Sequence, residues 1–581
     1  MRLFDSMKPQ LVRALVVVGL AATGAVLLFY TVAYLLTPLF AWLSPTLNPT
    51  LYDLGFYGAC PLQKYVSSDV TGLRTTAIKW DESCDNGYVL LTPSGDSVGA
   101  PGPTIIDSQG EVVWKAEGYQ VTTNLKVQKY KGQDYLTFWS GKKWGSLGAG
   151  SYFMLDSSYR VAYEVKAVGE NMFGDLHEFK ITNDDTALLT VYHTVDADLS
   201  PLGKASSGWL TENTFQEIDI ATGELLFEWR ASEHVDLTEG YMWNPFGGYL
   251  RNSPFDYYHL NSMDKDSHGN YLISARHTHT ITSLSPTGEI QWILGGRHNQ
   301  FTDLSGGAAL DFRWQHDARW WSEEEGILTL FDNQEGGVLN REGPYSKGMM
   351  LKLDVANRTV ELLHEYISLQ KTRAPSQGSV QYLPESNHMF VGWGHSPAFS
   401  EYSLNGTLLC EHHFGASWLH VWNRAVSYRS FKSTTWVGRP REPPSVKIED
   451  QTLYVSWNGA TEVVAWELQG AVTEADDYEF TALDVIDKEA FEESFELTDL
   501  WEYTRFRVAA LDRTGQVLSH SEVVSYHYEG GWWRTIFAVL AWAVVFTICW
   551  HVYKRIWRWK HTGANGFKWK SYELRTRQIP K

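Results

Sequence analysis

Histidines gather in one short stretch of the sequence. The segment HLNSMDKDSHGNYLISARHTHT, residues 259–280, contains His259, His268, His277 and His279. Neutral imidazoles bind zinc, copper or iron, and histidines two residues apart share one face of a strand. No HExxH or carboxylate–histidine pattern accompanies them, and four scattered cysteines cannot make a CxxC-type zinc cage. We therefore expect no resident metal and no other cofactor.

The DKDSHGN segment, residues 264–270, begins like a calcium-binding loop. It lacks the bidentate Glu that such a loop needs, because Ala275 and Arg276 occupy that region. Its Asp, Asn and Gly residues are typical of a tight turn between two strands. We therefore expect a hairpin turn here, with His268 facing solvent.

A second chemistry open to histidine is nucleophilic attack. An imidazole nitrogen can attack a sulfuryl or phosphoryl centre, provided that cationic or N–H donors surround the anions. Such donors occur in several segments of the chain, at His259, His316, Asn333 and Arg341. Any one of them alone is more simply a buried, hydrogen-bonded strand residue. As a group brought together in one fold, they favour a pocket that handles anions.

These residues belong to a chain with a recurring hairpin pattern. A small or acidic residue, a Gly or Asn turn and an alternating apolar strand recur at residues 105–118, 218–230, 283–296, 351–366 and 402–414. Irregular spacing with long insertions, such as 231–257, favours a β-propeller over a β-helix or a pair of sandwiches. A propeller brings strand ends from different blades to one axial pocket, where residues distant in sequence meet.

The C-terminal part of the body has a different sequence pattern. After Pro443 and Pro444, about seven short strands fill roughly 85 residues, the size of an immunoglobulin-like or fibronectin type III-like sandwich. We expect Trp457 or Trp466 to fill its core. This module leads directly into an apolar segment near the C-terminus.

Both ends of the chain carry a long apolar segment. Residues 14–36 contain no charge and residues 532–553 are nearly as apolar, so each is long enough to cross a ~30 Å hydrocarbon core as a helix. Basic flanks predict that the tails 1–13 and 554–581 are cytoplasmic and that the body between the spans is luminal or extracellular. The formal net charge of the chain is −19 despite these basic tails, which disfavours nucleic acid as a partner.

The predicted location bears on the cysteines and on two sequons. In an oxidising lumen, Cys60 and Cys84 lie close enough in sequence to be predicted partners in a disulfide. The NRT sequence at Asn357 and the NGT sequence at Asn405 are predicted glycan acceptors.

Several longer motifs occur in a fixed order: PGPTIIDSQGEVVW, HLNSMDKDSHGNYLISARHTHTI, GEIQWILGG, FRWQHDARW, LFDN, FVGWGHSPAFSEY and SYRSFKSTTWVGRPREPPSV. Together they resemble the arylsulfotransferase family, most closely its fungal membrane-anchored type. The resemblance implies an all-β fold. It consists of a six-bladed β-propeller over residues 44–440 and an immunoglobulin/fibronectin III-like β-sandwich over 443–527, with one transmembrane helix at each end.

The resemblance also implies an activity. An aryl sulfate would donate a sulfuryl group to a phenolic acceptor through a sulfohistidine intermediate, without phosphoadenosine phosphosulfate, and the sequence has no P-loop. It places His395 as the nucleophile, with His277 as the next candidate. The donors to the sulfuryl oxygens would be His259, His316, Asn333 and Arg341.

Substrate binding is expected from a further group of residues: Arg276, His277, Trp314 and Trp393. Two other functions stay open. One is a non-catalytic propeller that binds or assembles partners, and the other is a different transformation of an aromatic secondary metabolite in the same pocket. The sequence names neither the donor nor the acceptor.

Overall fold

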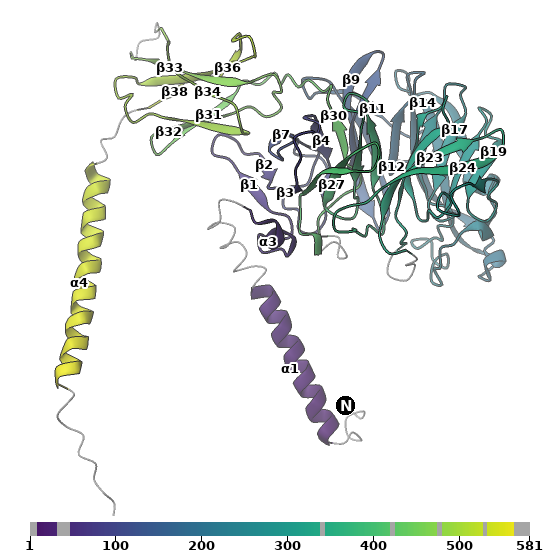
Figure 1. Ribbon diagram of the computed structural model, residues 1–581, viewed down its shortest axis with the longest axis horizontal. Coiled ribbons are helices and arrows are strands. Elements are labelled where there is room, and N and C mark those ends of the chain that lie inside the picture. Colours follow the sequence, from purple (N-terminus) through teal and green to yellow (C-terminus); the bar gives the residue numbers. More distant parts are fainter. Residues whose placement is uncertain are drawn as a thin grey trace, which may run out of the picture.

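The predicted mostly β architecture is confirmed by the computed structural model (Figure 1). The structure describes residues 9–31, 47–336, 343–418, 424–472, 479–526 and 532–562. Strands between residues 76 and 433 form a row of packed antiparallel sheets, and a separate pair of small sheets follows them.

The row of sheets is built from consecutive strands that pair as up-and-down meanders. The first sheet has the order β30-β4-β6-β7, from β30 (Phe431–Ser433), β4 (Tyr88–Leu91), β6 (Thr104–Ile106) and β7 (Val112–Lys115). Next come β8 (Val121–Tyr130), β9 (Gln133–Trp144), β10 (Leu147–Leu155) and β11 (Val161–Val165). These join, through a single pairing of Gly150 with Gly174, to β12 (Gly174–Ile181), β13 (Thr186–Ala197), β14 (Gly208–Asp219) and β15 (Leu225–Arg230).

Three groups of strands complete the row. One contains β16 (Leu260–Lys265), β17 (Tyr271–Ala275), β18 (Thr280–Leu284) and β19 (Ile290–Gly295). The next contains β21 (His316–Ser322), β22 (Ile327–Asp332), β23 (Lys347–Asp354) and β24 (Thr359–Tyr366), with the short β20 (Thr302–Asp303) at its edge. The last contains β25 (Ser379–Leu383), β26 (His388–Gly392), β27 (Ala398–Ser403), β28 (Leu408–His413) and β3 (Thr76–Lys79).

The first strands of these sheets contact one another in a closed cycle. Going around, β30 contacts β8, β8 contacts β12, β12 contacts β16, β16 contacts β21, β21 contacts β25, and β25 returns to β30. We call these the inner strands. The inner strands surround a common axis, and each begins at the same end of that axis. Residues that are far apart in sequence therefore meet at the two ends of the axis. Both ends are hollowed by cavities, which share these strands as walls.

The hairpin predictions are confirmed at all five places, as β6–β7, β14–β15, β18–β19, β23–β24 and β27–β28. A glycine is required in the first turn, since Gly110 has φ 91° and a Cβ there would lie 1.9 Å from the Thr75 hydroxyl oxygen. The β23–β24 turn differs from the prediction. There Arg358, not Asn357, takes the left-handed conformation, with φ 53°, because Asn357 hydrogen-bonds to Asp354 at 2.8 Å.

The cycle is closed by strands from both ends of the body. Strand β3 pairs with β28 in the last sheet, and β30 pairs with β4 in the first. A disulfide joins Cys84 to Cys410 across this closure, at a sequence separation of 326 residues. The predicted Cys60–Cys84 pair is therefore wrong. Cys60 is a buried free thiol instead, because ring closure brings β28, rather than the segment around Cys60, next to Cys84.

Apolar side chains fill the space between neighbouring sheets. Phe215, Trp229 and Tyr271 form part of one such cluster, and Leu272, Trp292 and Leu330 form part of the next. Each fully buried side chain of this size stabilises the fold by about 2–3 kcal/mol relative to its exposed state. Sheet-to-sheet packing therefore fixes the inner strands in place.

The C-terminal module consists of two facing sheets. One is built from β31 (Ser445–Glu449), β32 (Thr452–Ser456) and β35 (Glu492–Glu496); the other from β33 (Ala465–Ala471), β34 (Thr481–Asp487), β36 (Arg505–Leu511), β37 (Val517–His520) and β38 (Val524–Ser525). Trp466 is fully buried between them and Trp457 is half-buried, so the core prediction holds for Trp466.

Helices α1 (Pro9–Thr31) and α4 (Trp532–Thr562) overlap the two predicted spans, and the short α3 (Pro49–Asp53) precedes the sheets (Figure 1). Among the described residues, no helix is long and apolar enough to cross a membrane. Residues 32–36 of the first predicted span lie outside the described part of the chain.

Candidate active site

A cavity of about 870 Å³ opens where the inner strands begin. Its wall carries six histidines, two arginines and two tyrosines: His177, His193, His259, His277, His316, His395, Arg251, Arg276, Tyr192 and Tyr428. Most of them lie in β12 and β13, at or just before the starts of β16, β21 and β30, or in the segments that follow β17 and β26. We call this space the histidine cavity. It brings together most of the residues predicted for the site.

His259 is held by a carboxylate. Its Nδ1 lies 2.5 Å from Asp256 Oδ2, and its backbone N–H donates to the other oxygen of the same carboxylate at 3.1 Å. Asn213 also donates to Asp256, at 3.2 Å. The pairing places the proton on Nδ1, so Nε2 carries a lone pair at the cavity wall. His259 adopts φ 56°, a backbone conformation that is uncommon for residues other than glycine.

The pKa of His259 is lowered by burial, and His177 and Arg276 lower it further against the opposing effect of Asp256. The imidazole is therefore neutral at neutral pH. Burial alone would raise the pKa of Asp256, but His259 and His277 hold it well below its usual range. The result is a neutral ring oriented by an ionised carboxylate.

His177 repeats the arrangement. Its Nδ1 hydrogen-bonds to Asp175 Oδ1, and its backbone N–H donates to the same oxygen at 3.1 Å. Asp175 also accepts from the Gly148 N–H at 2.7 Å. The rings of His177 and His259 meet edge to face with centroids 4.7 Å apart. Two carboxylate-backed imidazoles thus stand side by side on the cavity wall.

His277 and His316 differ from this pair, because both ring nitrogens of each are already engaged. His277 Nδ1 donates to the Asp256 carbonyl oxygen at 2.9 Å and Nε2 accepts from Arg276 at 2.9 Å. His316 Nδ1 lies 2.7 Å from Asn333 Oδ1, and Nε2 accepts from the Gln377 N–H at 3.1 Å. Burial holds the pKa of each well below its ordinary value. They act here as fixed, neutral parts of the wall.

Arg276 is the buried cation of the cavity. It donates to His277 and to the Pro375 carbonyl oxygen at 2.9 Å, while its Nε has no hydrogen-bond partner among the described residues. Burial lowers its pKa to about 10. Its guanidinium lies over the Trp314 ring, 5.1 Å from the centroid. Trp314 is therefore placed behind Arg276 rather than on the cavity surface.

Tyr428 is a site residue that the sequence did not single out. It precedes β30, is only 5% exposed, and its hydroxyl has no hydrogen-bond partner among the described residues. Its ring meets His177 and His316 edge on, at 5.5 and 6.2 Å between centroids. Burial raises its pKa well above the ordinary value, so the hydroxyl keeps its proton and is a hydrogen-bond donor.

The remaining predicted residues are placed as follows. His395 lines the histidine cavity and is half-buried. Asn333 lies behind His316 and donates to the carbonyl oxygens of Ala374 and Gln377. Trp393 is not brought to the cavity, because its ring packs against Phe331 in the core and its N–H donates to Ser400. Arg341 lies outside the described residues.

One group in the cavity has the donor set of a metal site. Ligand atoms of Asp256, His259 and His277 all lie within 4.8 Å of one another. The guanidinium of Arg276, 2.9 Å from His277, would repel a cation bound there. Each of the three side chains is also accounted for by hydrogen bonds within the group. The geometry therefore fits an anion-handling site better than a cation site.

Comparison of the sequence with models of known protein families gives one match. Residues 126–415 match the family model described as arylsulfotransferase (ASST). The match supports assignment to the arylsulfotransferase family. The matched stretch includes the two carboxylate-backed histidines, His177 and His259. It also includes His316 and His395, whereas Tyr428 follows it. An arylsulfotransferase-like activity is what this family suggests.

No curated protein matches the chain significantly. Solved structures that resemble it include a protein of unknown function from Bacteroides caccae, 12% identical, covering 60% of this chain and 100% of its own, with a TM-score of 0.35. The periplasmic gluconolactonase PpgL of Pseudomonas aeruginosa is 11% identical and covers 76% of this chain and 97% of its own, with a TM-score of 0.32.

Proposed function

We propose that the histidine cavity transfers a sulfuryl group from an aryl sulfate to a phenol. The observation that carries the proposal is the Asp256–His259 pair, in which a carboxylate fixes the proton on Nδ1 and leaves Nε2 facing the cavity. A neutral imidazole oriented in this way is a nucleophile at neutral pH. The family match of residues 126–415 supports the choice of sulfuryl chemistry.

In the first half-reaction, His259 Nε2 attacks the sulfur of the donor. An N–S bond forms, the S–O bond to the aryl group breaks, and the phenolate leaves with the electron pair. The sulfated ring keeps its Nδ1 proton, and its positive charge faces the Asp256 carboxylate at 2.5 Å. This ion pair stabilises the intermediate.

In the second half-reaction, a phenol oxygen attacks the same sulfur. The O–S bond forms, the N–S bond breaks and His259 is restored. His177 is placed to accept the phenol proton on its Nε2, because Asp175 holds its Nδ1 and its ring lies 4.7 Å from that of His259. The donor is aryl sulfate itself, in line with the absence of a P-loop.

The sulfuryl oxygens need donors as charge develops on them. Tyr428 and Arg276 fit this role, since each has a buried N–H or O–H without a partner among the described residues. Such donors cost no reorganisation when the charge appears. We expect Tyr428→Phe to lower kcat by roughly 10²–10³-fold with a smaller change in KM, as measured with 4-nitrophenyl sulfate.

The scaffold that we propose for this chemistry is a six-bladed β-propeller. It is supported by the closed cycle of inner strands and by the meander order of the sheets. In such a fold the axial end of every blade faces one ligand site.

A burst experiment tests the carrier. Purified full-length protein is mixed with 4-nitrophenyl sulfate, with and without a phenol, and sulfated peptides are mapped by mass spectrometry. We expect His259→Ala to lose the nitrophenol burst and the modified peptide. His268→Ala, in an exposed turn, is the matched control and keeps both.

Two outcomes overturn parts of the proposal. A burst that survives in His259→Ala and disappears in His395→Ala moves the carrier to His395. If the wild-type protein releases no nitrophenol with any phenol, the sulfuryl-transfer function itself is wrong, and the cavity then belongs to a binding module.

A further inference from the structure

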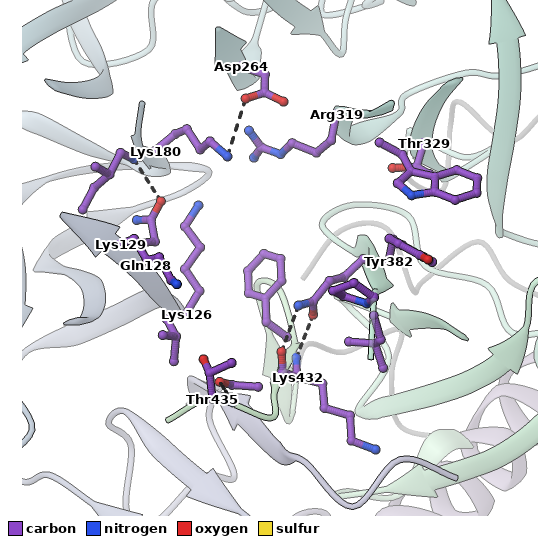
Figure 2. A pocket seen from close by; sticks show the side chains of 18 of the residues that line it. Lys126, Gln128, Lys129, Lys180, Asp264, Arg319, Thr329, Tyr382, Lys432 and Thr435 are labelled. Carbon is purple, nitrogen blue, oxygen red and sulfur yellow. Dashed lines mark hydrogen bonds and ion pairs between the residues drawn. The ribbon is translucent and has the colours of Figure 1, made fainter. Parts of the chain in front are cut away.

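The opposite end of the inner strands holds a second cavity, of about 580 Å³ (Figure 2). Its lining comes from the far ends of the same strands that form the histidine cavity. Five cationic side chains line it: Lys126, Lys129, Lys180, Arg319 and Lys432. We call this space the lysine cavity. Nothing in the proposed sulfuryl transfer uses it.

The floor of the lysine cavity contains a buried group of five charges. Glu178 accepts from Lys126 at 3.2 Å, from Arg429 at 3.0 Å and from Arg319. Asp317 lies 2.9 Å from Arg319 and 3.4 Å from Arg429. Side-chain exposure is at most 1% for the two carboxylates and 14% for the three cations. Three cations therefore share two carboxylates, which leaves one positive charge uncompensated.

The cavity is also lined by the half-buried Asp134, by Asp264 and by the exposed Glu385. Among the described residues, none of these three carboxylates forms an ion pair with the buried group of five charges. Asp264 is paired with Lys180 at 3.6 Å, and Glu401 is paired with Lys432 at 2.6 Å (Figure 2 shows the Lys180–Asp264 pair). Charges at the exposed rim are screened by solvent. An uncompensated buried charge is costly. Consistent with this, burial lowers the pKa of Lys126 to about 8, and Arg319 and Arg429 lower it against the opposing effect of Glu178.

Aromatic rings form the other side of the cavity. Trp321 and Tyr382 pack together with centroids 4.6 Å apart, and both line the space. The Lys126 ammonium lies 5.6 Å from the centroid of Phe431, a third lining ring. A flat apolar ligand can therefore contact rings while its charged end reaches Lys126.

We infer that the lysine cavity binds a small aromatic monoanion, with its acidic group at Lys126 and its ring against Trp321 and Tyr382. One negative charge balances the buried group, since three cations would then face three anions. A neutral phenol satisfies the aromatic wall but not the charge, so the site selects the anion. This site is separate from the histidine cavity and does not depend on the proposed transfer.

Titration with 1-naphthoate tests the inference, because this fluorescent carboxylate is neither a sulfuryl donor nor a phenol. Binding to the full-length protein is followed by fluorescence anisotropy. We expect saturable binding that weakens at least about tenfold in Lys126→Met. The matched control is Lys129→Met, which removes an exposed lysine from the same strand and the same cavity, and we expect its affinity to stay within about twofold.

A second variant and an acetylation measurement locate the bound naphthoate. His259→Ala must leave naphthoate binding unchanged, since loss there would put the ligand in the histidine cavity. Equal affinity in Lys126→Met, or no saturable binding at millimolar naphthoate, overturns the inference and indicates that Lys126 is simply a neutral amine. In the unmutated protein, naphthoate must also slow acetylation of Lys126 more than that of Lys129, as read by mass spectrometry, which guards against a folding defect in the variant.

Discussion

Two histidines in different regions of the molecule are held by a carboxylate at the same distance. In the histidine cavity, His259 Nδ1 lies 2.5 Å from Asp256, and at the ring closure His413 Nδ1 lies 2.5 Å from Asp53 of α3. Their pKa values nevertheless shift in opposite directions. That of His259 is lowered, whereas that of His413 is raised to about 9.

The neighbours explain the difference. Burial lowers the pKa of both rings, but His413 also has Glu411 at 3.5 Å from its second nitrogen. His259 has instead the Arg276 guanidinium and the His177 ring beside it. In each pair the carboxylate orients the imidazole, and the second group of neighbours determines whether the pKa of the ring is lowered or raised. The charged pair ties α3 to β28 and serves stability, while the neutral pair leaves a lone pair for chemistry.

Removing the orienting carboxylate is expected to give the largest effect. Asp256→Asn should lower sulfuryl transfer by roughly 10²–10⁴-fold, because the proton is no longer fixed on Nδ1 of His259. Asp53→Asn, the same change at the ring closure, should leave transfer per folded molecule within about twofold. Steady-state release of nitrophenol measures both. Equal losses in the two variants would contradict the division between a chemical pair and a structural pair.

The closure can also be weakened at its covalent link. Replacing Cys84 and Cys410 together by Ser should cost on the order of 2–5 kcal/mol of unfolding free energy, because the disulfide closes a very long loop. Thermal and urea denaturation measure it, with Cys60→Ala as the control that leaves the disulfide intact. Below the melting transition we expect the transfer rate to be retained, and its loss would mean that closure and cavity are not separable.

The charge on His413 predicts how stability depends on pH. Because its folded pKa is raised to about 9, its contribution is complete below the unfolded value of about 6.5 and is lost as pH rises through about 9. The loss over this window is on the order of 3 kcal/mol. His413→Gln should abolish this part of the pH dependence in urea unfolding.

The matched control is the neighbouring His412→Gln. His412 is also buried, but burial, Lys432 and His413 lower its pKa to about 4. The His412→Gln variant should therefore keep the decrease in unfolding free energy between pH 6.5 and 9. A wild-type stability that is flat over that range would show that His413 is not charged in the folded protein.

A smaller effect concerns the cation beside His259. Arg276→Met should raise the pKa of His259, since Arg276 is one of the groups that lower it. The acid limb of kcat/KM, where the nucleophile becomes protonated, should then move to higher pH by up to about one unit. Arg251→Met, at another position of the cavity wall, should not move it. A limb unchanged in Arg276→Met would assign the titration to a different group.

Local features of the fold were predictable from the sequence. Turn residues and alternating strands located all five hairpins, because these signals act over a few residues. The Asp266 turn was predicted for the same reason, and its side chain indeed accepts the backbone N–H groups of His268 and Asn270. The disulfide was missed because Cys84 and Cys410 meet only through closure of the whole cycle.

The site was predictable in part. His259, His316, His395 and Arg276 do line one cavity. The orienting carboxylates were missed, although Asp175-x-His177 and Asp256-x-x-His259 are visible spacings that place a carboxylate beside an imidazole at a strand start. Tyr428 carries no such signal, since an unpartnered hydroxyl is known only from its surroundings. The motif around Trp393 does not reveal which way its ring faces, and the ring packs in the core rather than in the cavity.

The exchange of strands at the closure has a consequence for biosynthesis. Strand β3 is made early but cannot pair until β28 of the last sheet has been made, and the first sheet is incomplete until β30 has been made. Contacts across such a long separation form late, because the loop entropy must be overcome first. A growing chain therefore cannot assemble the histidine cavity until Tyr428 and β30 have been made. We expect chains that stop before residue 431 to accumulate as open, protease-sensitive intermediates that never turn over substrate.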